Sequence, residues 1–304
     1  MKKCAVIGSI NMDMVVRTPR YPVAGETLEG LSFSTVPGGK GANQAIALAK
    51  LGVPVCMAGM VGDDSFGQMY IDHFRAVGVD CAAVTVKSGV TTGVADILVN
   101  DEGDNCIVVV PGANGECGGA WLEAALEKVM DCDIFLLQLE IPHDTVKECI
   151  ARLHEAGKTI ILDPAPAVPL DDEILSQVDY ITPNETELRI ITPSLPGDAG
   201  VEERVRHLIG ESDRTVIHKH GADGAYIATR SGIEHVPGYK VKAVDTTAAG
   251  DTFNAGFAAG LAMGLSVRES VKLANAAGAM AVTKLGAQAG MPSLEQARAL
   301  MEQA

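Results

Sequence analysis

The feature of this sequence that most restricts its fold is the alternation of short, almost wholly apolar runs with longer segments of helical pattern. Apolar runs of this kind suit strands buried on both faces, and the helices between them cover those faces. The sequence therefore predicts an α/β fold, a three-layer α/β/α sandwich around a mostly parallel sheet. The expected strands are Cys4–Ile10, Val55–Met60, Ile134–Leu139, Thr159–Leu162, Tyr180–Thr182 and Thr215–His218. The expected helices are Ala42–Leu51, Phe66–Val77, Gly119–Met130, Asp144–Ala156, Val201–Ile209, Asp251–Met263 and Val267–Lys284.

Two segments break this alternation. Short strands are expected at Met14–Arg17 with Thr27–Thr35, and at Gly93–Asn100 with Cys106–Val110, the second pair joined by a hairpin turn. We expect them to form a small antiparallel sheet, a β lid of about residues 12–36 and 92–110. No linker or internal repeat interrupts the chain, so residues 1–304 are expected to form one domain.

Composition argues against several classes of partner. The chain has 304 residues and a formal net charge of -15, which disfavours binding to nucleic acid or to an anionic membrane. The apolar runs are too short for a membrane span or an export signal. The seven cysteines are odd in number and lack Cys-x-x-Cys spacing, which indicates reduced thiols in the cytoplasm and no zinc site.

The most informative polar motif lies near the C-terminus. Ala248, Ala249 and Gly250 precede Asp251 where a loop becomes a helix of small residues. Bare backbone N–H groups in a first helical turn favour an anion, and Asp251 in the same turn is a candidate base. An aspartate that only caps the helix remains the alternative.

Other polar residues follow the expected strands. Asn11 and Asp13 come after the first strand, and Gly39–Asn43 is a glycine turn opening a helix, which does not have the spacing of a Walker loop. Glu140 ends a later strand. It is interpreted either as a contact to sugar hydroxyls or as a helix cap before Pro142. Asn184 and Glu187 have the spacing of a water-mediated Mg²⁺ site or of a capping box. In a parallel sheet these loops converge on one edge.

The motifs resemble those of the PfkB sugar-kinase family nearly from end to end. The segments that carry the resemblance are Gly39–Ala45, Pro183–Glu187 and Asp245–Phe253, with support from Gly8–Asp13, Pro111–Asn114, Leu137–Glu140, Pro164–Ala167 and Val282–Gln288. The resemblance implies a large α/β domain with a β lid, and ATP-dependent phosphorylation of a sugar's primary hydroxyl. The chain looks most like the members that act on D-ribose at its 5-hydroxyl.

The resemblance also implies roles for individual residues. Asp251 matches the base, and the amides of Ala248, Ala249 and Gly250 match the anion hole. The expected sugar contacts are Asn11, Asp13, Gly39, Lys40, Gly41, Asn43, Glu140 and Asp251. The expected nucleotide contacts are Asn184, Lys219, His220, Gly221, Ala222, Asp223, Gly224, Gly250 and Asn275, with Mg²⁺ held through water near Glu187. The expected K⁺ ligands are Asp245, Thr247, Ala281, Lys284, Gly286 and Gly290.

Three residues depart from the family pattern. Lys219 stands where a small hydroxyl residue is usual, Asn275 where a histidine is frequent, and Asp96 interrupts an apolar lid strand. The first two bear on the binding of the phosphate donor, and Asp96 on the homodimer that the resemblance implies through the lid. Two alternatives remain open. The substrate is another pentose, a nucleoside or a keto-sugar acid, or the protein binds a sugar without catalysis.

Overall fold

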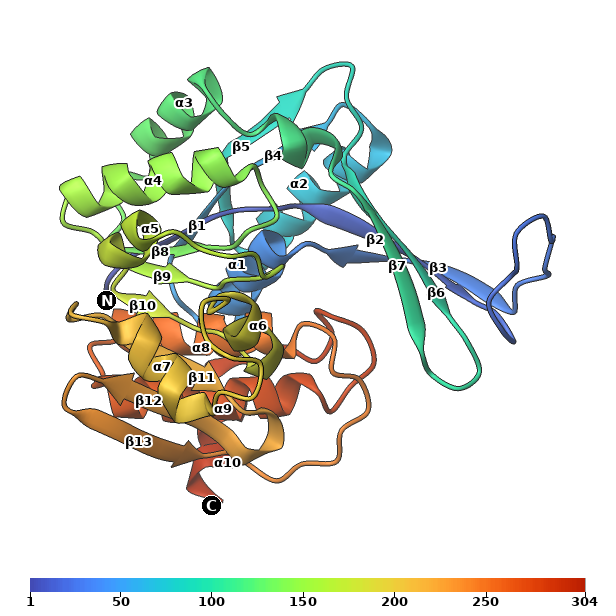
Figure 1. Cartoon of the computed structure of the whole chain (residues 1–304). Helices are drawn as coiled ribbons and strands as arrows, with labels where there is room; N and C mark the ends of the chain where they lie inside the picture. Colours follow the sequence, from blue (N-terminus) through green and yellow to red (C-terminus); the bar gives the residue numbers. More distant parts are fainter. Residues whose placement is uncertain (304) are drawn as a thin grey trace.

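The computed structural model describes residues 1–303 and contains the expected parallel sheet between two helical layers (Figure 1). In the described chain this sheet has nine strands in the order β13-β12-β11-β10-β9-β8-β1-β4-β5. The pairs from β11 to β5 are parallel, whereas β12 and β13 add antiparallel strands at one edge. The strands are β1 (Cys4–Ile7), β4 (Val55–Gly62), β5 (Asp80–Lys87), β8 (Ile134–Leu137), β9 (Thr159–Leu162), β10 (Tyr180–Ile181), β11 (Thr215–Lys219), β12 (Gly224–Thr229) and β13 (Gly232–Pro237).

Helices cover both faces of this sheet, and each face has its own apolar core. Alternate strand residues point to opposite sides, so Val6 packs in one core and Ala5 and Ile7 in the other. One core contains residues of α1 (Lys40–Lys50), α2 (Ser65–Val77), α8 (Ala249–Ala262), α9 (Val267–Ala281) and α10 (Leu294–Glu302). The other contains residues of α3 (Ala120–Val129), α4 (His143–Glu155), α5 (Asp172–Gln177), α6 (Glu185–Ile190) and α7 (Val201–Ile209).

Helices α8 and α9 pack closely because α8 carries glycine where the two backbones meet. A Cβ on Gly260 would lie 2.6 Å from Cα of Ser270, and one on Gly256 would lie 2.8 Å from Cα of Ala274. The small residues of this segment therefore have two uses. Those before Asp251 form the loop and first turn, and those further along α8 allow close packing against α9. Among residues 1–303, no helix combines the length and the apolar content needed to cross a membrane.

The lid is a second sheet that extends away from the main body as an arm (Figure 1). Its order is β3-β2-β6-β7, from β2 (Asn11–Arg17), β3 (Ser32–Gly38), β6 (Gly93–Val99) and β7 (Asn105–Val110). The hairpins β2–β3 and β6–β7 are antiparallel, as expected, and the central β2–β6 pair is parallel. Asn11 pairs with both Gly38 and Gly93, which anchors the lid where the first sheet strand ends.

Some predicted boundaries are wrong. The strand expected at residues 27–35 lies at Ser32–Gly38, because pairing with β2 continues as far as Asn11. The last long helix ends at Ala281 instead of residue 284, and α1 begins at Lys40, two residues earlier than expected. Strands β5, β12 and β13 were not predicted, because β5 and β13 are the edge strands of the sheet, β12 lies next to the edge, and all three mix polar with apolar residues.

Candidate active site

Polar side chains meet at the carboxyl edge of the sheet, where the strand order reverses between β1 and β8. Ser9 follows β1 and Glu140 follows β8, and the Ser9 hydroxyl donates to Oε2 of Glu140. The same oxygen accepts a hydrogen bond of 3.0 Å from the backbone N–H of Lys40 at the start of α1. Glu140 therefore binds the N-terminus of α1, and it does not cap α4, whose N-cap is Pro142. Its expected role as a sugar contact stays a prediction.

The candidate base Asp251 is buried in the first turn of α8, with 6% of its surface exposed. Nδ2 of Asn43 donates to its Oδ2 at 2.9 Å, and Nε2 of Gln44 donates to its Oδ1 at 3.2 Å. Burial raises the pKa of Asp251 to about 6; the charge of Lys40 and both amide donors oppose this rise, and Asp163 adds to it. A carboxylate with this pKa is ionised near neutral pH and basic enough to accept a proton.

The loop before Asp251 has an unusual backbone. Ala248 is the N-cap of α8 with φ 59° and ψ 15°, and no other non-glycine residue among residues 1–303 has a positive φ. The N–H of Ala249 donates to the carbonyl of Thr246 at 3.2 Å. Within the described chain the N–H groups of Ala248 and Gly250 take no part in the hydrogen bonds of this turn. Two of the three expected anion-hole donors are thus available, and the third is engaged by a long hydrogen bond.

Two of the expected sugar contacts, Asn11 and Glu140, border a cavity between the lid and the sheet edge. This cavity of about 460 Å³ is also bordered by Val109 of the lid. The side-chain oxygen of Asn11 accepts a hydrogen bond of 2.7 Å from Asn114, which also bonds the backbone of Ile10. Asn114 therefore fixes the orientation of Asn11 beside the cavity.

Asp13 lies close to this cavity, against the backbone of Gly38. A Cβ at position 38 would lie 2.3 Å from Oδ2 of Asp13, so only glycine leaves room for this carboxylate. Burial, reinforced by the charges of Glu140 and Asp251, raises the pKa of Asp13 to about 7, and Lys40 opposes the rise. Asp13 is thus held beside other carboxylates without a close cation.

Two lysines supply positive charge to the site. Burial disfavours the charged form of Lys40, but the charges of Asp251, Asp163 and Glu140 outweigh it and raise the pKa. Nζ of Lys219 donates to Oδ1 of Asp163 at 2.9 Å and lies 3.6 Å from Oε2 of Glu187. Both lysines are expected site residues, and the structure brings them to the same group of carboxylates.

Asn184 and Glu187 form a capping box at the start of α6. The side-chain oxygen of Asn184 accepts from the N–H of Glu187 at 2.8 Å, and Glu187 accepts from the N–H of Asn184 at 2.7 Å. Glu187 has the oxygen chemistry that Mg²⁺ takes, yet both of its oxygens accept from Asn184 and one faces Lys219. Among residues 1–303, no three His, Cys, Asp or Glu side chains gather closely enough to hold a metal ion. The carboxylate therefore fits a water-mediated contact better than direct ligation.

The segments expected to bind K⁺ lie side by side. Oδ2 of Asp245 accepts from the N–H of Gly286 at 2.8 Å, and Oδ1 accepts from the N–H and hydroxyl of Thr247 at 2.9 and 2.6 Å. Gly290 lies against Ala281, since a Cβ on Gly290 would be 2.0 Å from the Ala281 carbonyl oxygen. Carboxylate and carbonyl oxygens suit a hard cation. Lys284 lies in the turn between Ala281 and Gly290. The residues of these loops therefore fit K⁺, the expected ion.

The expected nucleotide loop follows β11. His220, Gly221, Ala222, Asp223 and Gly224 form a turn into β12, in which Gly221 and Gly224 have φ of 53° and 101°. The amide of Asn275 donates to the carbonyls of Val236 and Pro237 at 3.0 and 3.1 Å. Asn275 thus ties α9 to the end of β13, and its expected adenine contact stays a prediction.

Several residues of the site were not predicted. Gln44 donates to both Asp163 and Asp251, and its own oxygen accepts from Gln138 at 2.7 Å. Gln288 donates to the Asn43 side-chain oxygen at 3.0 Å, which connects the loop after α9 to the base. A glutamine within the buried, alanine-rich run of α1 was the one sequence signal for this network, because a fully buried amide needs partners.

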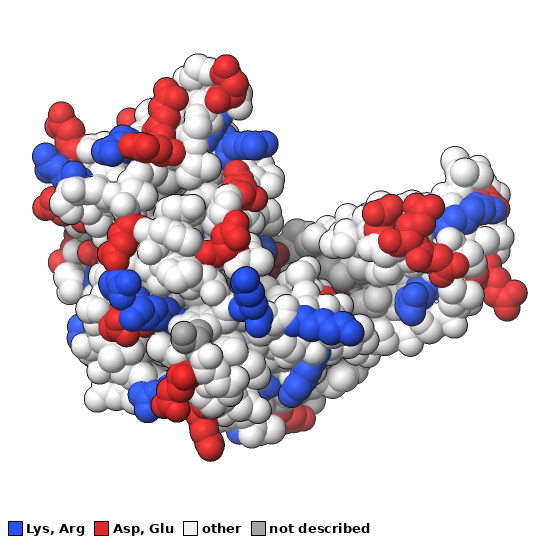
Figure 2. Space-filling model, turned by 90° about the horizontal axis from the view of Figure 1, so that it is seen from below, with Lys and Arg blue, Asp and Glu red and all other residues white. Residues whose placement is uncertain are grey.

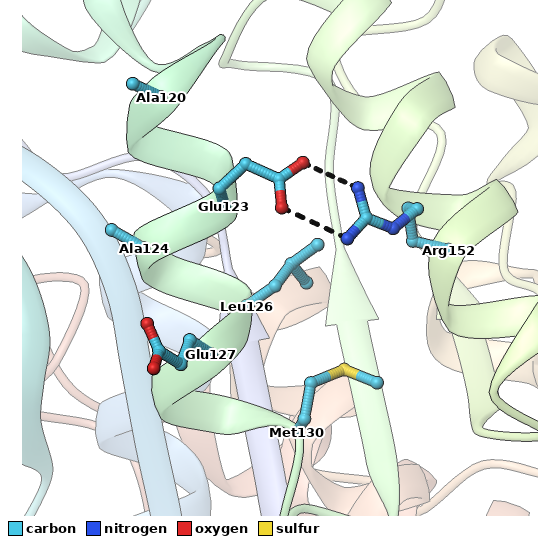
Figure 3. A pocket seen from close by; sticks show the side chains of 7 residues that line it. All are labelled: Ala120, Glu123, Ala124, Leu126, Glu127, Met130 and Arg152. Atoms are coloured by element: carbon cyan, nitrogen blue, oxygen red, sulfur yellow. Dashed lines mark hydrogen bonds and ion pairs between the residues drawn. The ribbon is translucent and has the colours of Figure 1, made fainter.

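A separate hollow of about 540 Å³ lies between α3 and α4 (Figure 3). Arg152 bridges it to Glu123 through two hydrogen bonds of 2.6 and 3.1 Å. It shares no residue with the site at the sheet edge, and Glu123 and Arg152 pair with each other. We assign no ligand to it.

Comparison with known proteins shows the family of this chain. A profile of the pfkB family carbohydrate kinases matches residues 1–294. A ribokinase of Bacillus subtilis is 40% identical over 301 residues, which cover 99% of this chain and 100% of the relative. A deoxyribokinase of Salmonella typhi is 37% identical over 295 residues, 96% of each protein. A structure of Arabidopsis thaliana ribokinase complexed with ribose and ATP has a TM-score of 0.91 and 32% identity, with 99% of each chain covered.

The family match spans the sheet, the lid and every loop that reaches the carboxyl edge. It also includes the segments on which the sequence resemblance rested, and the predicted fold class is the one observed. This chain therefore belongs to the pfkB family of carbohydrate kinases.

Proposed function

We propose that this protein transfers the γ-phosphoryl group of ATP to the 5-hydroxyl of D-ribose, giving D-ribose 5-phosphate. The observation that carries the proposal is the position of Asp251, a buried carboxylate beside the unengaged N–H groups of Ala248 and Gly250. One short element thus offers a base for a hydroxyl and donors for the phosphoryl oxygens. Nearly full-length similarity to a ribokinase supports ribose as the acceptor.

In this mechanism Asp251 accepts the proton of the 5-hydroxyl as that oxygen attacks the γ-phosphorus. The N–H groups of Ala248 and Gly250 stabilise the charge on the transferring phosphoryl oxygens, and Lys40 adds positive charge. Asn11, Asp13, Asn43 and Glu140, with Gly39 and Gly41 of the turn, hold the other sugar hydroxyls. Positioning and electrostatics account for the catalysis, because phosphoryl transfer needs little covalent participation by the protein.

The nucleotide is proposed to lie on the other side of the anion hole. We propose Asn184, the turn 219–224 and Asn275 as its contacts, the residues that the sequence resemblance implies. Glu187 would contact the hydration shell of Mg²⁺, which would supply charge neutralisation at the phosphates. The Asp245–Thr247 and Ala281–Gly290 segments would hold K⁺, which would supply a fixed charge near the loop carrying Ala248.

We also propose a cytoplasmic homodimer joined through the lid. Val108 and Val110 of β7 are 62% and 48% exposed, and Phe33 of β3, on the same face of the lid, is 64% exposed. Apolar side chains on a projecting sheet indicate a partner surface. On the face seen in Figure 2, acidic and basic side chains are interspersed over the body, and charged groups occur along the arm. All seven cysteines are free thiols, which suits a reducing compartment.

The test is coupled ADP release with ATP, Mg²⁺ and K⁺, comparing D-ribose with 2-deoxyribose, fructose and common nucleosides. We expect a clear preference for ribose that weakens when Na⁺ replaces K⁺. No ribose-dependent ADP release at millimolar ribose would refute the proposal, and turnover on another sugar alone would keep the family but change the substrate.

The similarity to a deoxyribokinase makes 2-deoxyribose the second candidate acceptor. The two sugars differ by one hydroxyl, so one hydrogen bond at the cavity decides between them. A ratio of kcat/KM for ribose over deoxyribose above one supports the first assignment, and the inverse ratio supports the second.

A further inference from the structure

Lys219 is a nearly buried lysine that faces two carboxylates of the site. It is the last residue of β11, and only 11% of its side chain is exposed. Its ammonium lies between two carboxylates that are themselves nearly buried, Asp163 at 4% and Glu187 at 13% side-chain exposure. The side chain therefore brings a cation to the carboxyl edge of the sheet and holds it between two loops.

The same ammonium also lies beside the anion hole. A Cβ on Gly250 would be 3.6 Å from Nζ of Lys219, and no other atom outside the immediate chain would lie within 4 Å of it. The open side of Gly250, next to the amide expected to bind phosphoryl oxygens, thus faces the lysine. A phosphate that reaches this amide comes within contact range of Nζ.

The surrounding charges explain why a lysine remains ionised at this depth. Burial opposes the charged form, but Asp163 and Glu187 outweigh it and raise the pKa of Lys219. Asp13, Asp163, Glu187 and Asp251 all lie in the same region, with Lys40 as the second cation. A nucleotide adds further negative charge, so its phosphates need a cation at their point of entry.

We propose that the Lys219 ammonium is a built-in cation of the nucleotide site, which binds the terminal phosphates of ATP and ADP at the mouth of the anion hole. This inference rests on the proposed kinase function. Lys219 stands between the carboxylates that would face a divalent ion, and it supplies part of the charge that such an ion brings. The site therefore binds nucleotide without a divalent cation, and Mg²⁺ strengthens binding only modestly.

A purely structural lysine would leave nucleotide affinity unchanged when it is replaced. Removing Lys219 alone leaves Asp163 and Glu187 without their cation, which destabilises a buried site, so the folding of each variant is checked before titration. Lys219→Met keeps the length of the side chain and removes the charge, whereas Lys219→Arg keeps the charge. Lys158 is the matched control: it is partly buried, donates to the carbonyls of Met130 and Cys132, and shares no contact with the site.

The experiment is isothermal titration calorimetry of the full chain with ATP, ADP and adenosine, each in EDTA and in Mg²⁺. For the wild type we expect ATP to bind in EDTA within about tenfold of its affinity in Mg²⁺. Lys219→Met should weaken metal-free ATP and ADP by tenfold or more and leave adenosine unchanged, because adenosine lacks phosphates. Lys219→Arg should recover most of the loss, and Lys158→Met should bind like the wild type.

Two results would overturn the inference. One is a wild type whose ATP affinity falls a hundredfold or more in EDTA, a measurement that does not depend on any variant folding. The other is folded Lys219→Met that binds metal-free ATP as tightly as the wild type. Ribose-dependent ADP release by the wild type tests the proposed function separately, so a kinase that binds nucleotide independently of Lys219 would contradict this inference alone.

Discussion

The side-chain amide of Gln44 lies 3.2 Å from Oδ1 of Asp251, although the two residues are 207 positions apart. The same Nε2 donates to Asp163 at 3.0 Å, so one amide from α1 links two carboxylates that would otherwise repel each other. Gln44 thereby lowers the proton affinity of Asp251 and sets the direction of its carboxylate. It is a positioning residue, which acts on the substrate only through Asp251.

Gln44→Leu should move the acidic limb of the pH–rate profile to higher pH. Asp251 must be ionised to accept a proton, and its pKa of about 6 predicts that kcat/KM falls as pH drops through 6. Removing the donor raises this pKa, by about one unit. Gln138→Leu is the control, because Gln138 contacts Gln44 but neither carboxylate. An unchanged limb in Gln44→Leu would contradict the role assigned to this amide.

Asp251→Asn should lower kcat by about 10²–10⁴-fold, because general-base assistance is lost while the side-chain volume is kept. Ribose affinity, measured by calorimetry, should change far less, since Asn11, Asp13 and Glu140 remain. Glu123→Gln, in the groove between α3 and α4, controls for loss of a carboxylate elsewhere. Turnover by Asp251→Asn at the wild-type rate would require a different base.

Short-range sequence patterns predict buried strands and local motifs, but they do not predict contacts between residues far apart in the chain. Buried central strands such as β8 are continuous apolar runs, so their positions were predicted. The edge strand β5 has one buried residue, Ala83, and includes Asp80 and Lys87, so its position was not predicted. Motifs located Asp251 and Lys40, but the pairing of Lys219 with Asp163 joins residues 56 positions apart, which no local pattern reports.

Asp13→Asn should stabilise the protein above pH 7 and weaken ribose binding. The pKa of Asp13 is raised to about 7 in the folded state, so folding favours its protonated form. The stability that this carboxyl contributes is fully present below its ordinary pKa of about 4, falls as pH rises from there, and is lost once pH has risen through 7. Asparagine removes this loss, and because Asp13 is partly solvated we expect a gain of about 1–2 kcal/mol at pH 8. Urea unfolding at pH 5 and pH 8 measures it; an equal effect at both values would contradict the linkage.

Val108→Glu should convert the proposed dimer to a monomer. Val108 is 62% exposed and pairs with Asp96 of β6, so the change places a second carboxylate opposite an existing one. Its neighbour Val109 points to the opposite side of the strand and borders the cavity beside Asn11 and Glu140, so the mutated side chain faces away from it. Sedimentation velocity should show half the wild-type mass, with the melting temperature of the main domain little changed. Val108→Thr, of similar shape and uncharged, should remain dimeric, and a dimeric Val108→Glu would exclude this face of the lid as the interface.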